Sequence, residues 1–256
     1  WLGYSIPMVK GPHQLCCGCA GSWSGACHLE RDDGHHVDSV SQSGSSRAMV
    51  LFRLLNGSID RVETYSLDCE LDASGLDFYW FSEVDSTQSL SFLEKRIGED
   101  TGEERQHGLL LAIAVHADPL ASLILEETAE SRPNDVAQKA IFWLGAMRSD
   151  EGLSALRRLE SASSDIELRK QIAFAFYVAK AGQATQELIR LARRDRSAEV
   201  RGKALFWLGQ KAGQQATAAL EQAVREDPEL EVKKKAVFGL SQLPPDEGVP
   251  LLIELA

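Results

Sequence analysis

The sequence predicts a mainly α protein: an α-solenoid of two-helix repeats over residues 103–256, preceded by a small mixed α/β cap over residues 1–102. Three observations support this fold class. Apolar residues recur with a period of 32 in the second region, which is typical of stacked helical repeats. Strand and hairpin signals occur in the first region. All five cysteines lie in the first 69 residues, and no histidine follows His116.

The cap is expected to begin irregularly, because residues 10–46 are rich in Gly, Ser and His. A β-hairpin then follows. Residues 47–55 form a mostly aliphatic run, Asn56-Gly57 is a strong tight-turn signal, and residues 59–66 supply the returning strand. The cap should therefore contain an antiparallel strand pair.

Residues 76–84 are a third strand candidate because they contain four consecutive aromatic side chains. Asp85 and Ser86 then cap a helix that runs to about residue 97. Its apolar side is expected to carry Leu90, Phe92, Leu93 and Ile97. The Gly- and acid-rich segment 98–104 is interpreted as the linker between the two regions.

The repeat is visible by subtracting residue numbers. Within each unit, apolar residues lie at i, i+4, i+6 and i+8, and the positions i, i+4 and i+8 share one face of a helix. The four sets, each with members 32 apart, are Val136, Leu168, Val200 and Val232; Ala140, Ile172, Ala204 and Ala236; Phe142, Phe174, Phe206 and Phe238; and Leu144, Phe176, Leu208 and Leu240. Each set marks the first helix of a unit.

A second apolar row marks the second helix of each unit. Its members are Leu156, Leu188, Leu220 and Leu252, again 32 apart. Gly or Pro residues separate the two rows, so each unit is predicted as helix, short turn, helix. We expect about five units, with an irregular first unit near Glu103 and a last unit that is cut short at the C-terminus.

Composition disfavours several classes of function. Apolar residues make up 44% of the chain and charged residues 25%, which is typical of a globular protein. The formal net charge is −11, and residues 1–102 account for −8 of it, so nucleic acid is not an expected partner. The sequence contains no uninterrupted run of 18 apolar residues, so no membrane span is predicted. The sequence has no nucleotide-binding glycine motif, and no cofactor is predicted.

The repeats resemble the HEAT-repeat family, particularly the short bacterial variety that also occurs in phycobilisome lyases. The residues that carry the resemblance are Asp195, Glu199, Val200, Arg201, Ala204, Leu205, Phe206, Leu208 and Gly209, and in the next unit Asp227, Pro228, Glu231, Val232, Lys233, Ala236, Val237, Phe238 and Leu240. The resemblance covers residues 103–256 and implies an armadillo-like α-solenoid that binds other proteins. Arg169, Arg201 and Lys233 share the period of 32, as do Asp195 and Asp227. The resemblance implies that these charges form a ladder between adjacent repeats, although Ser131 and Ser163 replace the Asp expected earlier in the chain; the alternative is a ligand site.

The cap resembles the leading region of exported bacterial HEAT-repeat proteins. The resemblance rests on residues 1–7, Cys16-Cys17, residues 27–30 and residues 68–72. It implies a periplasmic or extracellular location, provided that the cysteines form disulfides, because disulfides persist in oxidising compartments.

The cysteines admit three interpretations. Cys16, Cys17, Cys27 and Cys69 are candidates for disulfides, with Cys69 bridging back to the Cys16–Cys27 segment as the favoured pairing. Cys16, Cys19, Cys27 and His35 have the ligand types of a tetrahedral zinc site, although their spacing is not a standard one. The third interpretation is that the thiols are free.

Partner binding is predicted on the second helices, which usually line the concave face of such repeats. The candidate residues are Arg157, Arg158, Arg190, Arg193 and Arg194, which would attract an acidic protein or peptide. The alternative is a solvated helix face with ordinary i, i+4 ion pairs. Trp143 and Trp207, each in a Phe-Trp-Leu-Gly string, are expected in the core or, alternatively, on a groove wall.

The function predicted from these observations is that of a non-catalytic protein-interaction scaffold. The clear repeats contain no His or Cys, so a nucleophile and its base have no candidates there. Two alternatives stay open: a HEAT protein that acts like a phycobilisome lyase, and a cap whose metal site is the functional part.

Overall fold

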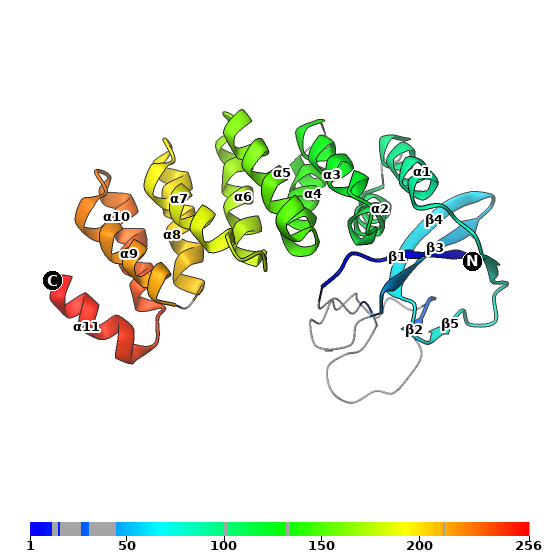
Figure 1. The fold of residues 1–256 in the computed structure, drawn as a ribbon, viewed down its shortest axis with the longest axis horizontal. Coiled ribbons are helices and arrows are strands. Elements are labelled where there is room, and N and C mark those ends of the chain that lie inside the picture. Colours follow the sequence, from blue (N-terminus) through cyan, green and yellow to red (C-terminus); the bar gives the residue numbers. More distant parts are fainter. Residues whose placement is uncertain are drawn as a thin grey trace. The chain divides into compact units, whose positions relative to one another are not determined.

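The chain is mainly helical, with a mixed β-sheet in its N-terminal part (Figure 1). The computed structural model describes residues 1–11, 15, 27–30, 45–99, 102–131, 134–211 and 213–255. Those residues form two compact units, Trp1–Trp143 and Leu144–Ala256. The predicted fold class is confirmed.

The first unit contains six strands and the first helices. The strands are β1 (Leu2–Pro7), β2 (Cys27–His28), β3 (Arg47–Leu55), β4 (Ser58–Ser66), β5 (Leu71–Asp72) and β6 (Tyr79–Phe81). The helices are α1 (Ser86–Glu99), α2 (Glu103–Val115), α3 (Leu120–Ser131) and the first part of α4 (Asn134–Met147). The predicted hairpin and the predicted helix after Asp85 are both present.

The main sheet has the strand order β4-β3-β1-β6. The β3–β4 pair is antiparallel and is closed by Asn56 and Gly57, whose φ angles of 52° and 77° are those of a tight hairpin turn. β1 lies between β3, to which it is antiparallel, and β6, to which it is parallel. β6 is shorter than the predicted strand 76–84.

The two faces of this sheet are covered differently. Trp1, Met49, Leu51 and Tyr65 face a cluster with Cys27 and Leu29, which come from the β2 segment. The opposite face packs against helices. α2 approaches β4 so closely that a Cβ on Gly108 would lie 2.3 Å from the backbone oxygen of Val62. Glycine at this position therefore lets the helix backbone rest directly on the sheet.

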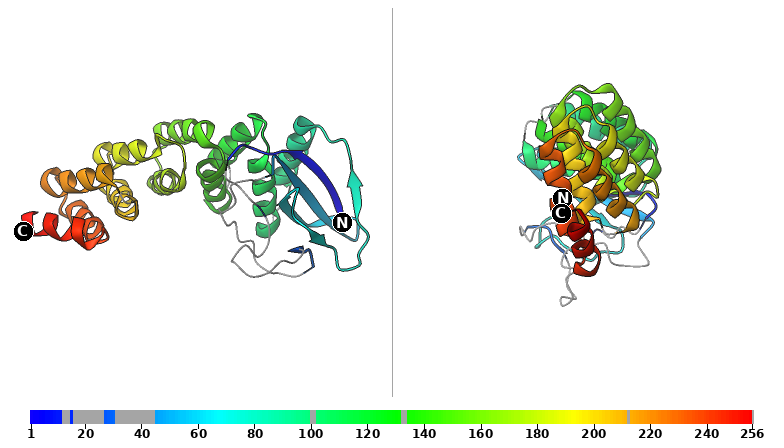
Figure 2. Two further views of the ribbon diagram at one scale, coloured as in Figure 1. Left: turned by 60° about the horizontal axis from the view of Figure 1, so that its bottom comes forward. Right: turned by 90° about the vertical axis from the view of Figure 1, so that its left-hand side faces the viewer.

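The second unit consists of helix pairs (Figure 2). After the end of α4, its helices are α5 (Ser149–Ala162), α6 (Ile166–Val178), α7 (Ala184–Arg194), α8 (Ala198–Gln210), α9 (Gln214–Glu226), α10 (Leu230–Ser241) and α11 (Pro245–Leu255). The helices α4, α6, α8 and α10 begin at residues 134, 166, 198 and 230, which are 32 apart. The repeat period found in the sequence is therefore the spacing of the first helices.

The first helices of consecutive pairs pack backbone to backbone. A Cβ on Gly209 of α8 would lie 2.6 Å from the Cα of Gly239 in α10, and one on Gly145 would lie 2.5 Å from the backbone oxygen of Ala175 in α6. The buried stripe of α8 is the predicted one, with Val200, Ala204 and Leu208 fully buried. Small residues at the contact allow these helices to lie close together.

Candidate functional site

Two of the predicted binding arginines are engaged in a network between α5 and α7. Arg157 of α5 lies 2.8 Å from a carboxylate oxygen of Glu187 and donates a hydrogen bond to the side-chain oxygen of Gln183. Arg190 of α7 pairs with Glu187 and, across the repeat boundary, with Glu160. These two arginines join neighbouring repeats, because each contacts a residue from the other helix.

The carboxylate of Glu187 is held in its charged form by this network. Burial alone would raise its pKa, but the hydrogen bonds from Arg190 and Arg157 outweigh burial and leave the pKa below the ordinary value. The charges of Arg157 and Arg190 are thus balanced by Glu160 and Glu187 within the protein. Charge reversal of Arg157 or Arg190 would disturb the helix pairing as well as any partner binding.

The other three predicted arginines are exposed. Arg158 lies on α5, whereas Arg193 and Arg194 form the last turn of α7. In the described part of the chain, neither Arg193 nor Arg194 has an ion-pair partner. Their position at a helix C-terminus is favourable for cations, because the helix dipole is negative there. The end of α7 is therefore a basic, solvent-facing point in an acidic chain.

The predicted inter-repeat ladder is confirmed. Arg169 contacts Asp195 through two hydrogen bonds of 2.9 and 3.3 Å, and Arg201 contacts Asp227 through two of 2.8 and 3.0 Å. Each aspartate also accepts a hydrogen bond from the backbone N–H two residues later. Lys233, the next residue in the series, donates to the backbone oxygen of Arg225. The constant spacing of these charges therefore places them to join neighbouring repeats to one another.

The Arg201–Asp227 rung should make stability depend on pH. Burial alone would raise the pKa of Asp227, but hydrogen bonds from Arg201 and from the backbone of Glu229 outweigh it and lower that pKa. A carboxyl group whose pKa is lowered on folding stabilises the fold above its unfolded pKa of about 4. This contribution is lost as the pH falls through the lower, folded pKa.

We therefore expect the urea midpoint of the wild-type protein to fall more steeply between about pH 5 and about pH 2 than that of Asp227→Asn. The exposed Asp246→Asn in α11 is the matched control and should follow the wild-type curve. Parallel curves for wild type and Asp227→Asn would contradict this role of Asp227.

The aromatic residues of the first helices form a row in the second unit. The ring of Trp207 lies 4.8 Å from those of Phe174 and Tyr177 and 4.9 Å from that of Phe206, and Phe206 stacks on Phe238 at 6.1 Å. Trp207 is half-buried, and its indole N–H has no acceptor among the described residues. Trp143 is also half-buried, against Phe142. Both tryptophans are therefore neither fully buried in the core nor fully exposed on a groove wall.

Most of the cysteine predictions fall outside the described residues. Those positions are Cys16, Cys17, Cys19 and His35. Cys27 is buried in the cluster beneath the sheet, and Cys69 packs against that cluster. The Sγ of Cys69 lies 3.1 Å from the backbone oxygen of Leu15, directly before Cys16 in the chain. This position is compatible with the favoured pairing, which stays a prediction, as does the export that depends on it.

No three His, Cys, Asp or Glu side chains among the described residues are placed to hold a metal ion. Three of the four proposed zinc ligands lie outside those residues, so the zinc site also stays a prediction. In the same part of the chain, no helix has the length and apolar character of a membrane span.

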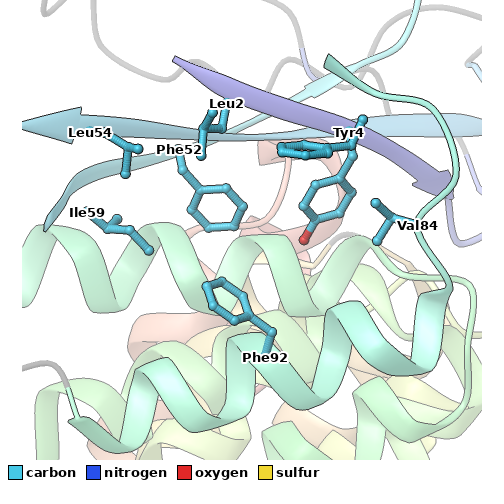
Figure 3. Close-up of a pocket in the computed structure, with 8 residues that line it drawn as sticks. Leu2, Tyr4, Phe52, Leu54, Ile59, Val84 and Phe92 are labelled. Carbon is cyan, nitrogen blue, oxygen red and sulfur yellow. The ribbon is translucent and has the colours of Figure 1, made fainter. Parts of the chain in front are cut away.

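An apolar groove that the sequence did not indicate lies in the first unit, between the sheet and α1 (Figure 3). Its volume is about 380 Å³. The strands contribute Leu2, Tyr4, Phe52, Leu54, Ile59 and Phe81, and the groove is completed by Val84 and Phe92. The rings of Phe52 and Phe92 make a T-shaped contact, with ring centroids 5.7 Å apart. We call this set of eight residues the sheet groove.

Phe92 was predicted on the apolar side of α1, but it is 43% exposed, whereas Leu90, Leu93 and Ile97 are buried. The physical reason is that α1 packs mainly against α2 and α3, whereas Phe92 faces Phe52 across the sheet groove. Phe81, on the edge strand, is 52% exposed.

A buried chain of hydrogen bonds lies behind the sheet groove. The hydroxyl of Tyr4 is 2.6 Å from Oγ of Ser89, which is 2.9 Å from Nε2 of His116. Nδ1 of His116 is 2.7 Å from the backbone oxygen of Ala112 and must donate to it, so Nε2 accepts from Ser89 when the ring is neutral. Burial raises the pKa of Tyr4 to about 12. The chain ties β1, α1 and α2 together and is fully satisfied internally.

Comparison with known families agrees with the helix pairing in the C-terminal part. The family model described as HEAT repeats matches residues 185–256. We call these matched residues the HEAT region. This HEAT region contains most of α7 and all of α8 to α11, and its Arg201–Asp227 rung is the one described above.

Solved structures also show similarity to this chain. A crystal structure of an engineered protein is similar to this chain, with a TM-score of 0.35 and 19% identity over 65% of this chain and 84% of that chain. No curated protein matches the chain.

Proposed function

We propose that the protein is a non-catalytic scaffold that binds a protein partner on the second helices of its repeats. HEAT repeats are generally protein-interaction scaffolds. The absence of His and Cys after residue 116 in the sequence supports the non-catalytic assignment, since those residues supply most nucleophiles and bases.

The observation that carries the choice of surface is the exposed pair Arg193 and Arg194 at the end of α7. Arg157 and Arg190 are engaged with Glu160 and Glu187, so they position the surface rather than bind the partner. A guanidinium pair recognises carboxylates through bidentate hydrogen bonds. We therefore propose a partner with an acidic segment, with Arg158 of α5 as a further contact.

The experiment is affinity capture from the native organism with wild-type protein and with the double variant Arg193→Glu/Arg194→Glu. Mass spectrometry should identify a protein that the wild type retains and the variant loses. The matched control is Lys234→Glu/Lys235→Glu, which makes the same change of net charge on exposed positions of α10. An identical set of captured proteins from wild type and the α7 variant would refute the proposed surface.

A further inference from the structure

We propose that the sheet groove of the first unit is a second binding site, and that its ligand is a short basic peptide bearing apolar side chains. This site is independent of the HEAT region and of the arginines of α7, because it lies entirely within residues 1–143. Its ligand also has the opposite charge to the partner proposed for α7.

The lining of the sheet groove determines the apolar part of the ligand. Seven of the eight lining side chains are aliphatic or phenyl groups. The eighth, Tyr4, has its hydroxyl engaged with Ser89, so it offers its ring to the groove. Leu54, Phe81 and Phe92 are between 43% and 52% exposed and surround the opening. Burial of apolar side chains of this size against a partner is favourable in free energy, because it removes them from water.

One lining residue, Phe81, lies on an edge strand of the sheet. β6 is the last strand in the order β4-β3-β1-β6, so one side of its backbone has no neighbouring strand among the described residues. All three of its residues are exposed, and all three are aromatic. Exposed aromatic residues on an edge strand are typical of a surface that a peptide covers.

The charge around the sheet groove determines the polar part of the ligand. Acidic side chains flank the groove lining in the sequence. Two of these acids, Glu83 and Asp85, directly flank the groove residue Val84, and both are exposed. An acidic rim attracts a basic ligand and repels an anionic one.

The basic residues next to the sheet groove do not cancel this charge. Arg53, which lies between Phe52 and Leu54, is paired with both Glu30 and Asp60. The hydrogen bonds from Arg53 lower the pKa of Glu30, so that carboxylate stays charged. Lys95 and Arg96, one turn beyond Phe92, share the carboxylate of Glu99 and keep one positive charge, which the one negative charge left on Arg53, Glu30 and Asp60 balances. Glu83 and Asp85 therefore decide the sign of the charge beside the groove.

The test is calorimetric titration of the full chain with a synthetic nine-residue peptide of alternating lysine and leucine, with both ends blocked. Two further peptides separate the contributions: one has glutamate in place of lysine, and the other has serine in place of leucine. We expect binding of the first peptide alone, weakening as salt is raised. Binding of the glutamate or serine peptide with similar affinity would overturn the proposal.

Variants of the protein locate the site. Phe81→Ser should weaken binding at least about tenfold, because a large apolar contact is lost. Glu83→Lys should weaken it about three- to tenfold at low salt and less at high salt. The matched controls are Phe238→Ser and Glu231→Lys, both on exposed positions of α10, and these should bind within about twofold of wild type.

Circular dichroism of each variant checks that the fold is retained, and Glu83→Lys provides the test if Phe81→Ser unfolds. Equal losses in the α10 controls would overturn the site. So would concentration-dependent dimerisation that Phe81→Ser abolishes, since a second copy of the chain would then be the occupant. The Arg193→Glu/Arg194→Glu variant should bind the peptide normally, so failure of this proposal is distinguishable from failure of the scaffold proposal.

Discussion

Replacing Arg169 by methionine is expected to reduce the free energy of unfolding by about 3–5 kcal/mol. The side chains of Arg169 and Asp195 are 3% and 2% exposed, and two hydrogen bonds join them. Removal of the guanidinium leaves a carboxylate that is buried with only a backbone N–H beside it. A charge in that environment is strongly destabilising. Urea unfolding followed by far-ultraviolet circular dichroism measures the change.

Two further variants isolate the cause. Arg193→Met removes an exposed arginine from the neighbouring helix and should change stability by no more than about 0.5 kcal/mol. The double variant Arg169→Met/Asp195→Leu should recover most of the loss, because a buried ion pair can be replaced by apolar residues at little cost. If the double variant is as unstable as the single one, the damage comes from packing and not from the orphaned carboxylate.

Leu208→Ala is expected to reduce the free energy of unfolding by about 2–5 kcal/mol. Leu208 is fully buried in α8, one residue before the glycine that contacts α10. Because α8 and α10 already touch through their backbones, the helices cannot close the cavity that truncation leaves. The same urea measurement applies.

The control for Leu208→Ala is Leu230→Ala, in which the leucine is 65% exposed at the start of α10. That change should cost no more than about 0.5 kcal/mol. A cost for Leu208→Ala as small as that of the control would place Leu208 outside the core and would contradict the repeat register.

The repeat could be predicted from the sequence because its information is local and repeated. The burial of Val200, Ala204 and Leu208 follows from helical periodicity, and the period of 32 reappears as the spacing of the first helices. The Arg–Asp ladder followed from the resemblance, since its partners lie at constant intervals. The β-hairpin was equally accessible, because Asn56-Gly57 specifies its turn.

β1 could not be predicted, although it is central to the sheet. The strand is covered on both faces, so its residues do not alternate between apolar and polar, and it contains Gly3 and Pro7. The structure explains Gly3: a Cβ there would lie 2.7 Å from the side chain of Leu51 and 3.0 Å from the rings of Phe78 and Trp80. The glycine is required by neighbours that are distant in sequence.

The sheet groove was missed for the same reason. Its lining comes from separate segments that are brought together only by the strand order. The available signal was the aromatic run that includes Phe81, which was predicted only as a third strand. The arginines also show what sequence cannot tell. Arg157 and Arg193 both lie on second helices of repeats, but among the described residues only Arg157 has an acidic partner, which a neighbouring helix supplies.

The parallel pairing of β1 with β6 has a consequence for how the chain folds. Residues 2–4 must wait for residues 79–81 before their strand has both neighbours, whereas the helix pairs of the second unit join segments about 30 residues apart. Chains dominated by distant pairings search longer for their native contacts than chains built from near ones. We therefore expect the N-terminal unit to fold more slowly than the helix pairs, because one edge of its first strand stays open until residues 79–81 have been made.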